Sequence, residues 1–254
     1  MQNIINFEKF HKEGFLILKN YLNQEIIRDI LKSIEILVDK NLGKELDTNL
    51  ENKILELEKI DHKLVYVIQK SLGTSIFSHK LINDLKIADI HSYLYSIDKH
   101  KIHTHLFQTP IQFPEDDRFD FSWHQESGSY MPFPKILTFW FPLLNNVNKT
   151  NGSMALIPQS HTNGQRKYKY IEKESGLNDW IVEASEEELK RNIIVDLQPG
   201  DVVIFDSDLI HKSVGNKSEN IRITGIARST NLYDYNKIMY MAEPTNYFNK
   251  EFQK

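Results

Sequence analysis

The stretch LQPGDVVIFDSDLIHKSVGNKSENIRITGIAR, residues 197–228, decides the fold that we predict. It reads as two short apolar strands: one follows the turn at 198–201 and ends at 211–213, and the other spans 221–226. Side chains alternate between the two faces of a strand, so His211 and Ser213 point one way together, as do Arg222 and Thr224. The pattern predicts a metal ligand and a cation that face one cavity.

A matching pair of ligands lies far upstream, in FSWHQE at 121–126. His124 and Glu126 share a face if this segment is extended. Two imidazoles and one carboxylate are the usual protein ligands of non-haem Fe(II), because they hold the metal and leave coordination positions open. Arg222, eleven residues beyond His211, is suited to bind the far carboxylate of a chelating diacid.

Composition indicates an ordinary globular protein. Of the 254 residues, 40% are hydrophobic and 26% are charged, and one large domain over 1–254 is expected. A net charge of −4 without a basic run gives no reason to expect a nucleic-acid or membrane partner. The chain has no cysteine, and its start lacks the basic and apolar segments of a signal peptide, so we expect a cytoplasmic protein. The oligomeric state is not predicted.

Hydrophobic periodicity divides the chain into two parts. Residues 1–95 read as mainly helical support, with helix boundaries at Gly14 and Asn23 and long apolar runs at 54–68 and 81–95. The part from 96 to 235 reads as a core of short strands, predicted at 102–112, 119–126, 136–143 and 153–158 and within the 197–228 stretch. An insertion at 160–192 interrupts this core and carries a short helix at 184–191.

Other residues of the sequence are alternatives to this site. His103 and His105 form the His-x-His that opens a cupin metal motif, but the nearest following glutamate is Glu115, so polar strand positions are the favoured interpretation. For Arg222 the structural alternative is a surface ion pair with an acid such as Glu219. Arg228 shares a face with Arg222 but lies about 20 Å further along an extended strand, so Arg222 is preferred.

Together these segments resemble the phytanoyl-CoA dioxygenase family of Fe(II)/2-oxoglutarate oxygenases over nearly the whole chain. The resemblance lies in FEKFHKEGFLIL at 7–18, WHQE at 123–126, NGSMALIPQSHTNG at 151–164, PGDVVIFDSDLIHKS at 199–213, and Arg222. It implies a double-stranded β-helix (jelly-roll) core with helices packed outside, which is an α+β arrangement. It also implies Fe(II), 2-oxoglutarate and O2 as cofactor and cosubstrates.

The resemblance assigns roles to individual residues. It implies His124, Glu126 and His211 as iron ligands, and Arg222 with Ser213 as the binding site for the distal carboxylate of 2-oxoglutarate. It further places Gln108 near the cosubstrate, Trp140 in the pocket wall and Tyr130 near the substrate. The family usually has aspartate where this chain has Glu126, which keeps the charge and the oxygen donor on a side chain one methylene longer.

The expected reaction is hydroxylation of an unactivated C–H bond in a small molecule, with release of succinate and CO2. One alternative keeps the site and changes the outcome to desaturation, cyclisation or epimerisation. Another is a catalytically silent jelly-roll binding protein. The retained carboxylate of Glu126 argues against halogenation. The loops at 114–119 and 160–192 are candidate lids.

Overall fold

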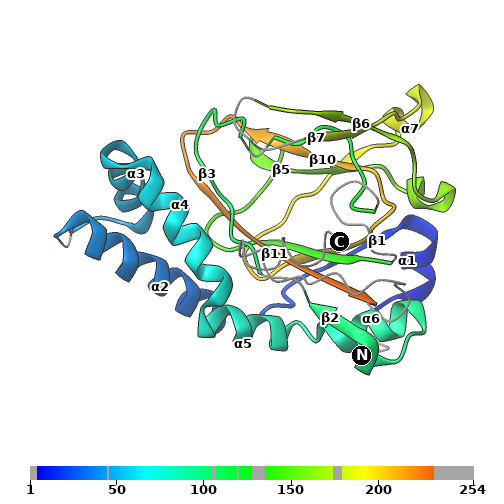
Figure 1. Cartoon of the computed structure of the whole chain (residues 1–254), viewed down its shortest axis with the longest axis horizontal. Coiled ribbons are helices and arrows are strands. Elements are labelled where there is room, and N and C mark those ends of the chain that lie inside the picture. Colours follow the sequence, from blue (N-terminus) through cyan, green and yellow to red (C-terminus); the bar gives the residue numbers. More distant parts are fainter. Residues whose placement is uncertain are drawn as a thin grey trace, which may run out of the picture.

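A computed structural model of the chain describes residues 5–44, 46–104, 107–118, 120–127, 135–173 and 179–231. Helices prevail before residue 102 and strands after it, and Figure 1 shows two groups of strands facing each other with helices at one end and beneath. The predicted α+β class, with strands prevailing after a helical N-terminal part, is confirmed. None of the helices in the described ranges combines the length and apolar character that a membrane crossing requires.

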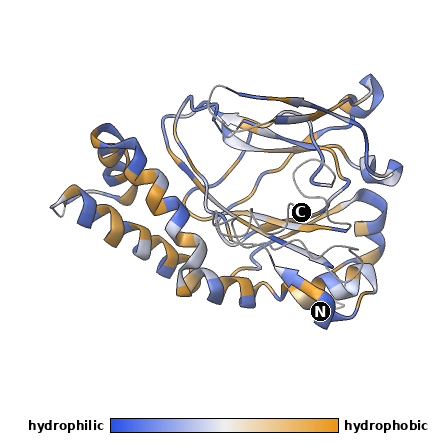
Figure 2. Cartoon of the chain, in the orientation of Figure 1, coloured by the Kyte–Doolittle hydropathy of each residue, from blue (hydrophilic) through white to orange (hydrophobic). Residues whose placement is uncertain are grey.

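Local capping residues define most of the helices. The helices are α1 (Phe7–Glu13), α2 (Gln24–Leu42), α3 (Leu50–Ile60), α4 (His62–Ser71), α5 (Ile76–Asp84), α6 (Ile87–Tyr95) and α7 (Glu186–Lys190), with short 3-10 turns at Leu72–Thr74, Lys99–Lys101 and Ser160–Asn163. As predicted, Gly14 ends α1 with a φ of 84°, and the Asn23 side chain caps α2. Figure 2 shows the alternation of hydrophobic and hydrophilic residues along α2 and its neighbours, which is typical of helices with one buried face.

Each of the two long apolar runs forms two helices instead of one. Asp61 separates α3 from α4, because its N–H donates to the carbonyl of Leu57 while its carboxylate accepts from the N–H of Lys63. Lys86, with a φ of 52°, separates α5 from α6. Hydrophobic spacing continues across both breaks, which is why periodicity did not reveal them.

The strands form two antiparallel sheets and a hairpin. The strands are β1 (Phe15–Leu18), β2 (Ile102–Thr104), β3 (Ile111–Gln112), β4 (Leu137–Pro142), β5 (Asn151–Leu156), β6 (Tyr168–Ile171), β7 (Asp179–Val182), β8 (Ile193–Ile194), β9 (Val202–Asp206), β10 (His211–Asn216) and β11 (Arg222–Asn231). The large sheet has the order β1-β9-β4-β11-β2, with β3 also paired to β11. The small sheet has the order β10-β5-β8, and β6 pairs with β7 within the predicted insertion.

The strand predicted from the 198–201 turn to 211–213 is in fact two strands in different sheets. β9 belongs to the large sheet, and β10 belongs to the small sheet. A turn at 207–210 joins them, and the Asp206 carboxylate stabilises it by accepting from the N–H of Asp208 at 2.8 Å. His211 therefore begins β10 instead of ending the preceding strand.

Side chains on the two faces of the large sheet belong to two different hydrophobic clusters. On the large sheet, Phe139 and Ile204 pack with the helices in one apolar cluster. Trp140 and Phe205, their neighbours along the chain, belong to a second cluster that also includes Met154 of the small sheet. The second cluster therefore fills the space between the sheets. Because Ile226 packs against it, the residues of β11 that share the face of Ile226, Arg222 and Arg228 among them, point into the same interior.

Candidate metal centre

Backbone pairing sets the two candidate histidines side by side. The N–H of His124 donates to the carbonyl of His211 at 2.9 Å, and the N–H of His211 donates back at 3.0 Å. Residues directly opposite each other in an antiparallel pair project from the same face. Accordingly, the ring centroids lie 4.1 Å apart, and the His211 ring lies 4.6 Å from that of Phe205 in the interior cluster.

The metal-site segment is not the continuous strand that we predicted over 119–126. Within residues 120–127, His124 and Ser127 form single bridges, and Glu126 lies in a turn between them. Gln125 anchors this turn, since its side-chain amide donates to the carbonyls of Asp208 and Gly164. These contacts come from residues distant in the sequence, so local strand propensity could not predict the turn.

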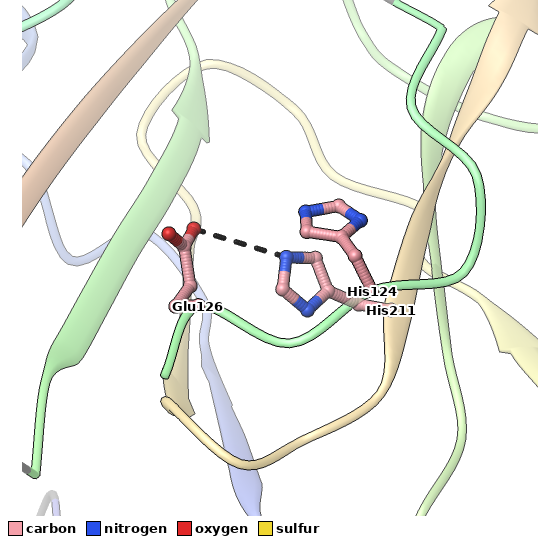
Figure 3. Close-up of side chains that lie close together, drawn as sticks. All are labelled: His124, Glu126 and His211. Atoms are coloured by element: carbon pink, nitrogen blue, oxygen red, sulfur yellow. Dashed lines mark ion pairs between the residues drawn. The ribbon is translucent and has the colours of Figure 1, made fainter. Parts of the chain in front are cut away.

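Three side chains converge at this point. His124, Glu126 and His211 each offer one ligand atom, and these atoms all lie within 4.8 Å of one another. Figure 3 shows the two imidazoles and the carboxylate facing a common point, with Glu126 Oε1 3.8 Å from His211 Nε2. Among the described residues, no other group of three or more histidine or acidic side chains has comparable geometry.

Carbonyl groups fix how the two rings are oriented. Nδ1 of His124 lies 2.7 Å from the carbonyl oxygen of Ser122, and Nδ1 of His211 lies 2.9 Å from that of Leu209. A carbonyl only accepts, so each Nδ1 carries the proton and donates. Nε2 of each ring is thereby left with its lone pair, which is the form that binds a metal ion.

Burial keeps the two histidines neutral, and neighbouring groups keep the carboxylate of Glu126 charged. It lowers the pKa of His211 to about 3 and also lowers the pKa of His124, because the charged imidazolium is poorly solvated in the interior. Burial alone would raise the pKa of Glu126, but the charge and hydrogen bond of Arg228, together with the two neighbouring imidazoles, hold that pKa below its usual value. Two neutral nitrogens and one carboxylate oxygen are the donor set that suits a non-haem Fe(II) centre with open positions.

Arg228 binds the candidate metal carboxylate. Its Nη2 donates to Glu126 Oε1 at 2.9 Å, and its Nη1 donates to Gln108 Oε1 at 2.9 Å. Arg228 lies on the inner face of β11, as the sequence indicated, but its contact with Glu126 was not predicted. The signal available in the sequence was the even spacing between Arg222 and Arg228, which places both guanidinium groups on one face.

Arg222 lies in the same interior without such contacts. It is 6% exposed, and its Nε and Nη1 have no hydrogen-bond partner among the described residues. Burial lowers its pKa to about 10, which still leaves the guanidinium charged near neutral pH. The predicted alternative, a surface ion pair with Glu219, does not describe this buried side chain.

A glycine lies next to the Arg222 guanidinium. A Cβ added to Gly152 would lie 2.8 Å from Nη1 of Arg222, so the absence of a side chain there makes room for the guanidinium. Gln112 lies opposite Arg222 in the β3–β11 pair, and its amide donates to Asp120 Oδ1 at 2.9 Å. Buried donors without partners beside a glycine fit the carboxylate of a small diacid.

The remaining predicted residues are Gln108, Trp140, Ser213 and Tyr130. Gln108 contacts Arg228, as described above. Trp140 is 5% exposed and packs in the interior cluster. Ser213 lies on β10 two residues after His211, and its hydroxyl makes no hydrogen bond to Arg222 within the described ranges. Tyr130 lies outside the described residues.

The cupin-type alternative does not gather a site in the described part of the chain. His103 is exposed on β2, and His105 lies outside the described residues. His11 lies on α1 with Nε2 2.8 Å from the carbonyl oxygen of Leu94. Among the described residues, neither His11 nor His103 belongs to a group that could hold a metal ion.

Comparison with solved structures shows the fold. The non-haem monooxygenase ThoJ in its apo form matches with a TM-score of 0.61 and 15% identity, covering 89% of this chain and 77% of ThoJ. EvdO2 from Micromonospora carbonacea var. aurantiaca, complexed with 2-oxoglutarate, matches with a TM-score of 0.61 and 15% identity over 91% of each chain. The epimerase SnoN, in complex with Fe3+, alpha ketoglutarate and nogalamycin RO, matches with a TM-score of 0.55 and 15% identity, covering 89% of this chain and 82% of SnoN. The predicted jelly-roll fold is confirmed.

Comparison with family models identifies the family. The model of phytanoyl-CoA dioxygenase (PhyH) matches residues 10–224, which include His124, Glu126, His211 and Arg222. This match extends from α1 into β11 and so spans both the helical part and the two sheets. The chain belongs to the phytanoyl-CoA dioxygenase family.

Proposed function

We propose that this chain is an Fe(II)- and 2-oxoglutarate-dependent dioxygenase that hydroxylates a C–H bond of a small molecule and releases succinate and CO2. One observation carries the proposal: ligand atoms of His124, Glu126 and His211 lie within 4.8 Å of one another in the interior of a protein of this family. EvdO2 in complex with 2-oxoglutarate and SnoN with Fe3+ and alpha ketoglutarate support the choice of metal and cosubstrate.

The three ligands are prepared for a divalent metal ion before it binds. Nε2 of each histidine is unprotonated, since Nδ1 donates to a main-chain carbonyl. Glu126 is ionised beside Arg228, so binding of the metal requires no proton to leave the carboxylate. Fe(II), together with 2-oxoglutarate and O2, supplies the oxidising chemistry when bound.

Arg222 binds the far carboxylate of 2-oxoglutarate in this proposal. Its buried Nε and Nη1 are the donors that such a carboxylate satisfies in a charge-assisted pair. Ser213, on the same inner face of β10 as His211, is the proposed second donor. A buried guanidinium also makes the pocket selective, because a monoacid of the same length leaves this charge without a partner.

Apolar side chains of the interior limit access of water to the centre. Trp140, Phe205 and Met154 line the space between the sheets, and the first two are 5% and 0% exposed. Excluding water strengthens the electrostatic contacts of the ligands and protects a reactive centre from side reactions. The segments at 114–119 and 160–192 remain our candidates for the lids that admit the substrate, and Tyr130 for a substrate contact.

The experiment is to incubate the purified chain with Fe(II), 2-oxoglutarate and O2, with a panel of small molecules, and to measure succinate. Succinate above the level without substrate is the expected result, and His211→Ala is expected to remove it. Full succinate formation by His211→Ala, or none by the wild-type chain with Fe(II) bound, would contradict the proposal.

Product mass distinguishes the reaction outcomes. Hydroxylation adds one oxygen atom, desaturation or cyclisation removes two hydrogen atoms, and epimerisation leaves the mass unchanged. The likeness to the epimerase SnoN is the observation that keeps the last outcome as a second candidate. An unchanged mass with altered chromatographic retention would favour epimerisation over hydroxylation.

A further inference from the structure

The contact between Arg228 and Glu126 joins residues far apart in the sequence. The guanidinium side chain is 11% exposed and the carboxylate side chain 3%, so their 2.9 Å contact lies away from bulk solvent. A buried ion pair contributes far more to holding a geometry than an exposed one, because neither partner has water as an alternative. The pair therefore restricts where the Glu126 carboxylate can lie.

Gln108 restricts Arg228 in turn. Its Oε1 accepts from Nη1 of Arg228 at 2.9 Å, on the opposite side of the guanidinium fork from Glu126. The main chain of Gln108 is bound to Ile226 in both directions, with N···O distances of 3.0 Å and 2.8 Å. The acceptor for Arg228 is thus anchored to β11 itself, two residues from Arg228.

Glu126 is one methylene longer than the aspartate that the family usually has, so its carboxylate needs to be held in place. A glutamate side chain has one more rotatable bond than an aspartate, so its carboxylate samples more positions when nothing holds it. Metal affinity depends on ligands that are held in place before the ion arrives, and contacts to the ligands commonly change that affinity. Arg228 removes this freedom by binding Oε1, while Oε2 makes no hydrogen bond to a described residue.

We propose that Arg228 is a positioning residue that holds the longer carboxylate of Glu126 for the metal ion, with Gln108 orienting the guanidinium. The two interior arginines of β11 then have different partners: Arg228 binds a carboxylate of the protein, and Arg222 binds a carboxylate of the cosubstrate. This inference rests on the metal centre of the proposed function, and it extends that function to a residue outside the ligand set.

A double-mutant cycle tests the coupling between the two side chains. Co(II) is titrated anaerobically into the metal-free wild-type chain, Arg228→Gln, Glu126→Asp and the double variant, and the dissociation constant and the ligand-field absorption spectrum are recorded. Arg228→Gln is expected to weaken Co(II) binding by about 10–100-fold and to alter the spectrum at saturation. In Glu126→Asp the carboxylate is drawn back by one methylene, so the added Arg228→Gln change is expected to have little further effect.

Three further variants separate positioning from general damage. Gln108→Leu keeps both charges and is expected to weaken Co(II) binding less than Arg228→Gln does. Arg222→Gln, the matched comparison on the same face of β11, is expected in the absence of 2-oxoglutarate to change Co(II) affinity much less than Arg228→Gln does. Arg228→Lys retains the charge but not the fork, and it is expected to restore part of the affinity lost in Arg228→Gln.

The possible results separate the failure of this inference from the failure of the function. Equal Co(II) affinity in the wild-type chain and in Arg228→Gln, or additive effects in the double variant, would overturn the positioning role and leave the metal centre intact. Absence of stoichiometric Co(II) binding by the wild-type chain would instead overturn the metal centre, and the positioning role with it.

Discussion

The two interior arginines of β11 differ in their hydrogen-bond partners. Arg228 donates to Glu126 and to Gln108, both at 2.9 Å. Arg222, six residues earlier on the same face, is 6% exposed and has no hydrogen-bond partner for Nε or Nη1 among the described residues. The guanidinium of Arg228 therefore has partners within the protein, whereas two donors of the Arg222 guanidinium have none among the described residues.

This difference indicates where a ligand belongs. A buried charge without a partner is costly, so a fold that keeps one uses it for a ligand that supplies the missing charge. A buried charge that already has its partner serves the internal structure. By this reasoning, the Arg222 end of the interior receives a diacid, and the Arg228 end arranges the metal ligands.

The largest expected effect is on the stability of the metal-free chain. Arg228→Met leaves the buried carboxylate of Glu126 without its partner, and the free energy of unfolding is expected to fall by about 3–5 kcal/mol. Arg222→Met replaces a buried cation, whose Nε and Nη1 have no hydrogen-bond partner among the described residues, with an apolar side chain, and is expected to leave that free energy equal or higher. Urea unfolding in the presence of a chelator measures the free energy of unfolding of both variants. An equal loss in the two variants would contradict the difference proposed between Arg228 and Arg222.

The second prediction concerns the cosubstrate. Arg222→Met is expected to weaken binding of 2-oxoglutarate to the Mn(II)-loaded chain by about 2–4 kcal/mol, because it removes a buried charge-assisted contact. Calorimetric titration in the absence of O2 measures this affinity. Binding of 2-oxoglutarate that survives in Arg222→Met and is lost only in Arg228→Met would reverse the two assignments.

A third prediction concerns the space beside Arg222. Gly152 has a φ of 85°, and an added Cβ would lie 2.8 Å from Arg222 Nη1 and 3.0 Å from the carbonyl oxygen of Val214. Gly152→Ala is expected to reduce the free energy of unfolding by about 1–2 kcal/mol through its backbone conformation alone. It is also expected to weaken 2-oxoglutarate binding, because the alanine methyl group displaces the guanidinium.

Gly43, at the end of α2, provides the control for this prediction. It has a φ of 68°, and an added Cβ would meet nothing within 4 Å. Gly43→Ala should therefore lose stability because of its positive φ and keep its affinity for 2-oxoglutarate. Equal 2-oxoglutarate affinity in the two alanine variants would show that the space at Gly152 does not serve the diacid.

The smallest expected effect concerns the residues that keep Arg222 available to bind 2-oxoglutarate. Gln112 donates to Asp120 Oδ1 at 2.9 Å, and Asp120 is the acidic group whose charge acts on Arg222. Gln112→Leu releases Asp120 to compete for Arg222, so 2-oxoglutarate affinity is expected to fall by roughly 0.5–1 kcal/mol. Asp120→Asn removes the competing charge, and affinity is expected to rise by a similar amount. A decrease in both variants would show that Asp120 assists the diacid.

Features set by neighbouring residues could be predicted from the sequence. Gly14 as the end of α1, Asn23 as the cap of α2 and the short helix within 184–191 depend on contacts within one turn of the chain. The resemblance to the family supplied the pairing of distant segments, which local patterns do not contain. The spacing of His211 and Arg222 then placed a cation on the inner face of β11.

Features set by distant contacts could not be predicted. The division at Asp61 occurs within a continuous apolar pattern, and the turn at 207–210 separates two strands that read as one. The contact of Arg228 with Glu126 crosses 102 positions of sequence. Strand geometry separated Arg228 from Arg222 along β11, but it gave no information about which side chain would contact Arg228.

The most direct test of this account is a structure of the chain crystallised without O2 in the presence of Fe(II) and 2-oxoglutarate. The account predicts one metal ion bound by His124, Glu126 and His211, the far carboxylate of the diacid on Arg222, and Arg228 still bound to Glu126. A diacid whose far carboxylate binds Arg228, or a metal ion bound without Glu126, would contradict it.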